Sequence, residues 1–165
     1  SIHSLRWYSK EVVPNDLIEK VVELAMTAPS ACNRQSIKVY VISSEAKIRQ
    51  VLDLQEGNRG FGEHACKLLC VTSDMRCYNA THRPMANVDG GIFTMNLLYA
   101  LHYFKIAACT LNACFNKIER KKLCSILGMD KAEFPIAFVS IGKAPDKFMV
   151  AASQRLNVKS IINFC

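Results

Sequence analysis

The longest apolar stretch in the chain runs from Gly90 to Phe104, and it limits the possible folds more than any other segment. It contains Thr94, Asn96 and His102, and it is shorter than the roughly 18 apolar residues needed to cross a bilayer. Its apolar residues lie on all sides of a helix, so the pattern predicts a helix that opens at Asp89 and is buried all round. Because a small chain has little room to enclose such a helix, we also expect it to contact a second subunit.

The length of 165 residues suits one domain, residues 1–165, with a core of its own. Half of the residues are hydrophobic and 21% are charged, which is ordinary for a globular protein. The first fifteen residues contain His3, Arg6 and Lys10 but no apolar block, so we expect no secretory signal.

Eight cysteines raise the possibility of a disulfide scaffold or a metal site. Most of them lie in apolar runs such as 67–71 and 106–113, which is typical of core thiols in a reducing cytoplasm. Cys66 and Cys70 with His64 supply at most half of a metal site, and no second pair completes it, so we expect no metal. A cysteine-based thiol or metal protein is the alternative from another class.

The net charge of +7 raises the possibility of nucleic-acid binding. The densest basic cluster, residues 117–122, has helical spacing and includes Glu119, so a solvated helix face is the better interpretation. No zinc finger, recognition helix or aromatic-basic strand motif accompanies it, and we expect neither nucleic acid nor membrane as a partner. Positive charge also attracts anionic ligands.

Helices and strands are expected to alternate along the chain. The predicted helices are 15–28, capped by Asn15 and ended before Pro29, then 45–54, the buried helix, and a helix from the Asn116–Glu119 capping box to Gly128. The predicted strands are 37–43, 67–73, 106–111 and 134–141. Residues 143–165 form a tail with an apolar end, which we expect to pack on a partner subunit. Alternation favours a parallel sheet, but no phosphate-binding glycine loop of the common nucleotide folds follows any strand.

Three separated segments carry candidate binding residues. In an extended 3–6 segment, Ser4 and Arg6 point the same way and can present a hydroxyl and a guanidinium to one anion. In the polar loop 28–35, Asn33 and Gln35 can each donate and accept hydrogen bonds, as reading the edge of a planar heterocycle requires. Segment 109–114 offers small residues whose backbone can approach a ring. Taken singly, each segment is equally compatible with an ordinary terminus, capping loop or strand end.

Together and in this order, the segments resemble the nitroreductase family of FMN enzymes. The stretches that carry the resemblance are HSLRWYS, APSACNRQ, GNRGF, VDGGIFTMNLLYALHYFKIAACTLNA and SQRLNVKSII. APSACNRQ, which resembles the helix-ending flavin loop, is the most specific of them. The chain departs from the family pattern at Ile2, where the family has an arginine, and at Lys105 and Ala107, which replace glycines.

The resemblance implies an α+β fold in which a mainly antiparallel central sheet is flanked by helices and two chains interlock as a homodimer. It implies that FMN takes hydride at its N5 atom from NADH or NADPH and passes the electrons to a nitroaromatic, quinone-like or other acceptor. No side chain is expected to be a catalytic nucleophile or base. A flavin-binding protein that stores or senses FMN without efficient turnover is the alternative.

Site residues follow from the same resemblance. His3 and Ser4 would lie by the FMN phosphate and ribityl chain, Arg6 near the pyrimidine edge, and Arg155 on the phosphate. The partner subunit would supply Pro29, Ser30 and Asn33 to the ring system, in a loop that Gln35 helps to shape. The backbone facing flavin N5 would be that of Leu111, Asn112 and Ala113.

Overall fold

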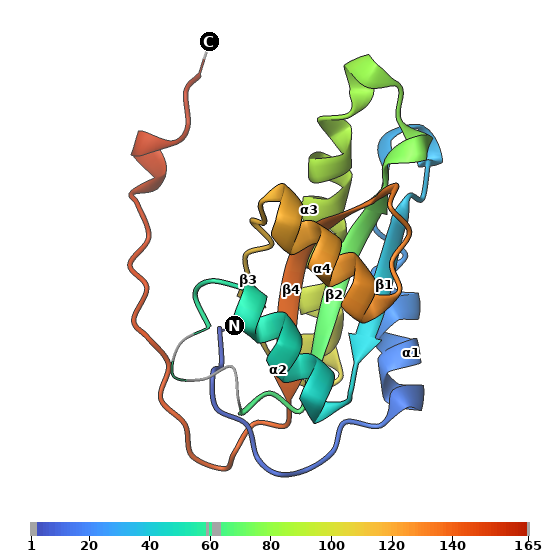
Figure 1. The fold of residues 1–165 in the computed structure, drawn as a ribbon. Coiled ribbons are helices and arrows are strands. Elements are labelled where there is room, and N and C mark those ends of the chain that lie inside the picture. Colours follow the sequence, from blue (N-terminus) through green and yellow to red (C-terminus); the bar gives the residue numbers. More distant parts are fainter. Residues whose placement is uncertain (1–2, 59, 61–63, 165) are drawn as a thin grey trace.

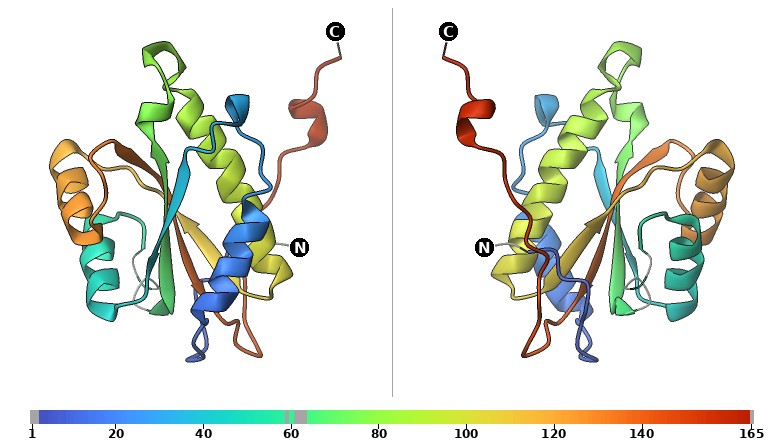
Figure 2. Two further views of the ribbon diagram at one scale, coloured as in Figure 1. Left: turned by 90° about the vertical axis from the view of Figure 1, so that its right-hand side faces the viewer. Right: turned by 90° about the vertical axis from the view of Figure 1, so that its left-hand side faces the viewer.

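A computed structural model describes residues 3–58, 60 and 64–164, and it contains a four-stranded sheet between two layers of helices (Figures 1 and 2). The sheet has the order β1-β2-β4-β3 and every neighbouring pair is antiparallel. Its strands are β1 (Ile37–Ile42), β2 (Lys67–Asp74), β4 (Glu133–Gly142) and β3 (Ala107–Leu111). The predicted α+β class with an antiparallel sheet is confirmed.

The connection between β1 and β2 explains why alternating elements do not produce a parallel sheet here. Ile42, the last residue of β1, pairs with Leu68 near the start of β2. Helix α2 (Glu45–Leu54) and the segment after it therefore return the chain to the end of the sheet that it left. A parallel pair needs a crossover to the opposite end instead. The sequence predicted the bounds of α2 correctly and those of β1 to within one residue.

Each face of the sheet carries two helices (Figure 2). Helices α1 (Asn15–Ala25) and α3 (Met85–Tyr103) cover one face, and α2 and α4 (Lys117–Leu127) cover the other. The first face buries the apolar stripe of α1, formed by Ile18, Val21 and Ala25, against Leu97 and Leu101 of α3. The second face buries one side each of α2 and α4 in a separate core around Phe138. The sheet thus separates two cores.

The prediction for α3 was wrong in two respects. The helix begins at Met85, one turn before Asp89, because Pro84 occupies the N-cap position. Asp89 lies inside the helix and is 2% exposed. Within one chain α3 is also not buried all round, because one side of it is open to solvent. The large apolar side chains on this open side are Val88, Ile92, Met95, Tyr99 and Tyr103.

The ends of α1 also differ from the prediction. Asn15 is the first helical residue rather than the cap, and its side-chain oxygen accepts a hydrogen bond from Lys67 Nζ at 2.7 Å. The helix ends at Ala25, before the predicted end at residue 28. The predictions for α4 are confirmed: Asn116 and Glu119 form a capping box, and Gly128 ends the helix with a φ of 66°.

Both chain ends lie on the side of the sheet that α1 and α3 cover (Figure 2). Near the N-terminus, Ser4 forms a parallel bridge with Ala108 of β3, so this segment extends the sheet at that edge. After β4 the tail of residues 143–164 runs away from the body of the molecule (Figure 1), and residues 151–164 are all exposed. Within the described ranges, no helix combines the length and the apolar character that crossing a membrane requires.

Candidate functional site

The N-terminal segment is anchored along the edge of the sheet. The Leu5 amide donates to the Ala108 carbonyl at 3.0 Å, and the Ser9 amide donates to the Lys143 carbonyl at 2.8 Å. The ring of Tyr8 lies on Gly142, where an added Cβ would come within 2.6 Å of it. The Tyr8 hydroxyl lies 2.8 Å from Ser140 Oγ, and burial raises its pKa, so it stays neutral. These contacts fix the segment, so Ser4 and Arg6 are not on a loose terminus.

The anchored segment and the tail enclose a cavity of about 820 Å³, here called the tail cavity. From the N-terminal segment it is lined by His3, Ser4, Arg6 and Trp7; from α3 by Met95; and from the tail by residues 149–153 and Arg155. Its volume is within the range of small-molecule sites, roughly 300–1,000 Å³. Three sequence-predicted residues of the N-terminal segment, His3, Ser4 and Arg6, therefore meet the distant Arg155 in one cavity.

The chemistry of the tail cavity suits an anion. Arg6 and Arg155 each offer a planar fork of N–H donors, which matches the oxygens of a phosphate. Ser4 adds a hydroxyl that can donate or accept, and no residue that lines the cavity in the described chain is acidic. Met95, Trp7 and the apolar tail residues supply walls suited to an organic ring. The donor set fits a phosphorylated heterocycle such as FMN.

The polar loop between α1 and β1 has an unusual backbone. Cys32, Asn33 and Gln35 have positive φ angles of 53°, 54° and 48°. Non-glycine residues adopt this conformation rarely, and it recurs at binding and active sites, where the surroundings hold it. Within the loop, Ser30 accepts two hydrogen bonds, from the Asn33 amide at 2.9 Å and from the Gln35 amide at 3.1 Å. The Asn33 side chain is exposed and available to a ligand.

Within one chain the loop does not reach the tail cavity. Pro29, Ser30 and Gln35 line a separate cavity of about 150 Å³, and Pro29 also borders a groove of about 340 Å³ on the exposed side of α3. Met95 lines both this groove and the tail cavity. The loop and the tail cavity therefore flank the same open side of α3. That the loop joins the cavity of a partner subunit remains a prediction.

The segment after β3 is engaged in structural contacts. Leu111 is buried in the core beneath α2 and α4, and Ala113 packs against that core. The Asn112 amide group donates to the Glu56 carbonyl at 2.9 Å, and the Asn112 carbonyl accepts from Gln55 at 3.2 Å. None of these three residues lines the tail cavity. Their predicted place beside a flavin ring remains a prediction.

The cysteines are divided between core and surface. Cys70 and Cys109 are buried, Cys66 and Cys124 are half-buried, and three are exposed, namely Cys32, Cys77 and Cys114. All seven are free thiols, and Cys165 lies outside the described residues. Over the part of the chain that the structure covers, no group of three or more His, Cys, Asp and Glu side chains is arranged to hold a metal ion.

Sequence reasoning missed Trp7 and Met95 as cavity walls and the buried Asp89. Trp7 gave no signal beyond its place beside Arg6, and Met95 looked like one core residue among many. Asp89 did give a signal, because a carboxylate that directly adjoins an apolar stretch can be buried with it, and a buried carboxylate requires hydrogen-bond donors. Of the departures from the family pattern, Ile2 lies outside the described residues, and Lys105 has a φ of 57°, a conformation that glycine adopts most easily. Arg59 and Phe61 of the GNRGF stretch also lie outside the described residues.

Comparison with known proteins supports the resemblance by sequence. The model of the nitroreductase family matches residues 2–58. This stretch includes the anchored N-terminal segment and the whole polar loop of residues 28–35, here called the strained loop because three of its residues have positive φ angles. The predicted resemblance to the nitroreductase family is thereby confirmed.

Solved structures extend the likeness over nearly the whole chain. A protein from Exiguobacterium sibiricum, solved in complex with FMN, matches with a TM-score of 0.86 at 20% identity, over 99% of this chain and 93% of that one. A nitroreductase family protein from Streptococcus pneumoniae matches with a TM-score of 0.85 at 19% identity, over 99% and 96%. An FMN-dependent nitroreductase from Clostridium difficile matches with a TM-score of 0.83 at 16% identity, over 99% and 95%. At these identities the matches establish a shared fold.

Proposed function

We propose that this protein is an FMN-dependent oxidoreductase that takes electrons from NADH or NADPH and reduces a small-molecule acceptor. The observation that carries the proposal is the tail cavity, where Ser4, Arg6 and Arg155 meet beside apolar walls. The family resemblance over residues 2–58 and the FMN complex of the Exiguobacterium protein, which shares the fold, support it. The proposal needs no catalytic side chain, because FMN supplies the hydride chemistry when bound.

The chain's own residues bind and orient the cofactor. His3, Ser4 and Arg155 would hold the phosphate and ribityl end, with Arg155 giving two parallel hydrogen bonds to phosphate oxygens. Arg6 would lie near the pyrimidine edge, where a positive charge stabilises negative charge on the ring. Trp7 and Met95, which line the cavity, would contact the apolar part of the ring system.

We further propose that the functional unit is a homodimer. The open side of α3 and the tail expose large apolar side chains, among them Tyr103 at 73%, Met149 at 95% and Phe164 at 92%. Soluble monomers rarely expose contiguous apolar patches of this kind. A second copy would cover both regions and bring its Pro29, Ser30 and Asn33 toward the tail cavity. Sedimentation across a range of protein concentrations tests this, and a monomer at every concentration contradicts it.

Spectroscopy of the purified chain tests the oxidoreductase proposal. We expect the protein to bind FMN, and anaerobic stopped-flow mixing with NADH or NADPH to bleach the visible absorbance of the bound flavin. A bound flavin that neither nucleotide reduces would favour a storage or sensing protein. A colourless protein that takes up no added FMN would refute the proposal.

Arg155→Ala tests the phosphate contact directly. If Arg155 binds the phosphate, its loss should cost about 1.5–3 kcal/mol of FMN binding, the range for hydrogen bonds to charged groups. Titration of the FMN-free protein with FMN measures the change. Lys159→Ala is the matched control, because Lys159 is also an exposed cation of the tail but does not line the cavity. Equal affinities for wild type and Arg155→Ala would remove Arg155 from the site.

A further inference from the structure

Buried hydrogen bonds join α3 to the strained loop through Asp89. The Oδ1 atom of this carboxylate accepts from the Ala31 amide at 3.0 Å, and its Oδ2 atom accepts from the Tyr78 hydroxyl at 2.7 Å. Asp89 is 2% exposed and Tyr78 is 5% exposed. In these two hydrogen bonds, the loop contributes the backbone N–H of Ala31 and no side chain. The bond to Asp89 therefore restrains the backbone of the loop.

The hydrogen bonds continue from Tyr78 into the sheet with one polarity. Tyr78 has a single hydroxyl proton, which it donates to Asp89, so its oxygen must accept from Ser36 Oγ at 2.7 Å. Ser36 in turn must accept from Ser73 Oγ at 2.9 Å. Burial, followed by the contact with Asp89, raises the pKa of Tyr78, which keeps this proton in place. Asp89 is the final acceptor of this series of hydrogen bonds, and it also accepts from the Ala31 amide.

The loop requires such support. Left-handed geometry costs roughly 1–2 kcal/mol for each non-glycine residue, and Cys32, Asn33 and Gln35 all adopt it. Arg34 provides a second restraint, because its guanidinium donates to the Ala31 carbonyl at 2.9 Å and to the Cys77 carbonyl at 3.0 Å. The same guanidinium lies 5.4 Å from the centre of the Tyr78 ring. Asp89 thus holds the amide of Ala31 and Arg34 holds its carbonyl, so the two peptide units that flank the Ala31 Cα are both restrained.

Asp89 itself is on a rigid support. The next residue, Gly90, packs so closely on β4 that a Cβ there would come within 2.8 Å of the Ile136 side chain. The helix cannot shift at this point without disturbing the sheet. Because Asp89 is held in place, its hydrogen bond also fixes the position of the Ala31 amide.

We propose that Asp89 is a positioning residue for the strained loop and, through it, for the cofactor. By holding the Ala31 amide it helps to keep Cys32, Asn33 and Gln35 in their left-handed conformation, so that Ser30 and Asn33 are presented to bound FMN. The inference rests on the proposed function for the identity of the ligand. The restraint on the loop is a property of the chain with or without FMN, and it can be tested without the cofactor.

Amide hydrogen exchange of the FMN-free protein measures the restraint. In Asp89→Ala the Ala31 amide should exchange about tenfold faster or more, since a buried donor loses its acceptor. Amides of α3 and β4 should be unaffected. Asp89→Asn should restore protection, because its oxygen still accepts from Ala31 while its NH₂ donates to Tyr78 and reverses the polarity of the chain. Unchanged exchange at Ala31 in Asp89→Ala overturns the proposal.

Tyr78→Phe keeps the test open should Asp89→Ala not fold. It removes one of the two contacts of Asp89 while the ring still fills its space, so protection at Ala31 should fall by a smaller factor. Equal protection in this variant and in wild type counts against the proposal.

FMN titration then separates positioning from general stability. Asp89→Ala should raise the FMN dissociation constant about tenfold, and Asp89→Asn should stay close to wild type. Thr94→Val is the matched control, because it removes a buried hydroxyl of α3 that donates only to Gly90. If Asp89→Ala lowers the unfolding midpoint but leaves FMN affinity at the wild-type value, the role is merely structural and the proposal fails. If wild type binds no FMN, the proposed function fails, while the exchange result still decides the restraint.

Discussion

The two faces of the sheet differ in how completely one chain closes them. On the α2/α4 face, α2, every residue of which is described, exposes none of its large apolar side chains, and α4 exposes only Ile118. On the α1/α3 face, five large apolar side chains of α3 are exposed, and the tail lies on the same side of the sheet (Figure 2). The apolar side chains of α2 and α4 are thus largely enclosed within a single chain, whereas those on the open side of α3 are not.

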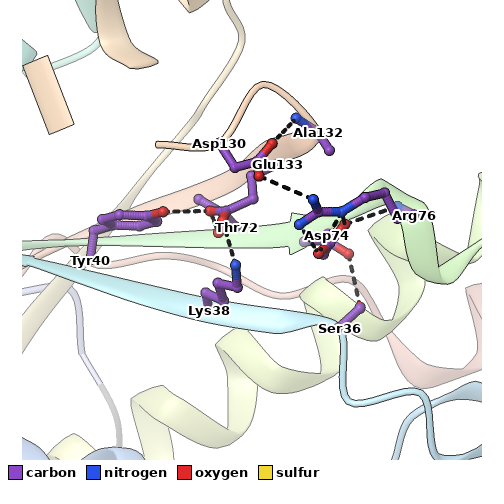
Figure 3. Close-up of polar contacts among 10 residues, drawn as sticks. Ser36, Lys38, Tyr40, Thr72, Asp74, Arg76, Asp130, Ala132 and Glu133 are labelled. Carbon is purple, nitrogen blue, oxygen red and sulfur yellow. Dashed lines mark hydrogen bonds and ion pairs between the residues drawn. The ribbon is translucent and has the colours of Figure 1, made fainter. Parts of the chain in front are cut away.

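Among the described residues, each face also buries one carboxylate, and the hydrogen-bond partners of the two differ. Glu133, 1% exposed, accepts from Lys38 Nζ at 2.6 Å, the Tyr40 hydroxyl at 2.7 Å and the Thr72 hydroxyl at 3.1 Å (Figure 3). All of these donors are side chains of neighbouring strands, so the cluster only joins the sheet to itself. Asp89 instead holds the backbone of a loop. A buried carboxylate thus joins strands of the sheet on the α2/α4 face, whereas on the α1/α3 face it restrains the loop between α1 and β1.

Local conformational preferences are obeyed on the α2/α4 face and broken on the α1/α3 face. Helix α4 has its capping box and ends at a glycine, whereas α3 is followed by Lys105 at positive φ and faces a loop with three more such residues. Departures from local preference concentrate where function needs a specific shape. The contrast supports a site on the α1/α3 side.

The largest expected effect that tests this comparison is that of Glu133→Ala. Three donors lose their acceptor, so the free energy of unfolding should fall by about 3 kcal/mol. Urea denaturation measures it, with Glu133→Gln as the milder matched change. FMN affinity of the folded Glu133→Gln protein should equal that of wild type. A large loss of FMN affinity in Glu133→Gln would mean that the two faces are coupled, and it would contradict the separation of their roles.

Alkaline stability compares tyrosines on the two faces. Burial, followed by the hydrogen bond to Glu133, raises the pKa of Tyr40 to about 12, and burial also raises that of Tyr78. An unfolded tyrosine ionises near pH 10. The unfolded state therefore loses its proton first, and stability that is fully present below pH 10 is lost as the pH rises toward the folded pKa.

For Tyr40 this loss should amount to about 1–2 kcal/mol between pH 10 and 12. Tyr40→Phe and Tyr78→Phe should each flatten the fall in unfolding free energy, measured by urea denaturation at pH 9 and pH 11. A slope that is the same in Tyr40→Phe as in wild type would show that Tyr40 ionises equally in both states.

The smallest expected effect concerns the ends of α3 and α4. Lys105→Gly should raise the free energy of unfolding by about 1 kcal/mol, because glycine adopts the observed φ of 57° without strain. Gly128→Ala, at a φ of 66°, should lower it by a similar amount. Thermal unfolding of both variants, compared with wild type, measures these two changes in stability. A destabilised Lys105→Gly would indicate that the lysine side chain has a contact worth more than the strain.

The sequence predicted best where local signals decide the structure. The bounds of α2, the Asn116 capping box and the Gly128 stop depend on residues close in the chain, and all are confirmed. The antiparallel sheet came from family resemblance, since alternation alone favours a parallel one. Asp89 was misplaced at a helix start because a carboxylate is equally at home in a first turn. Its real partners, Ala31 and Tyr78, come from other segments.

The site shows the same division. Arg6 and Arg155 are 149 positions apart, and no spacing rule could bring them together; only the resemblance pointed to both. The strain of the loop was not foreseen, because Cys32 and Gln35 carry no local preference for positive φ. The open side of α3 was predicted to be buried because an apolar pattern on all sides of a helix does not tell which side one chain encloses.

If Arg155 binds the phosphate of FMN, as proposed, the tail makes cofactor retention separable from folding. Arg155 belongs to an exposed stretch that follows the last strand, so one cut by trypsin after Lys147 would release it without breaking any strand pairing. The remaining chain would stay folded yet hold its ligand poorly. The cellular lifetime of the loaded form therefore depends on what shields that peptide from proteases, and trimmed but intact-looking material is its expected breakdown product.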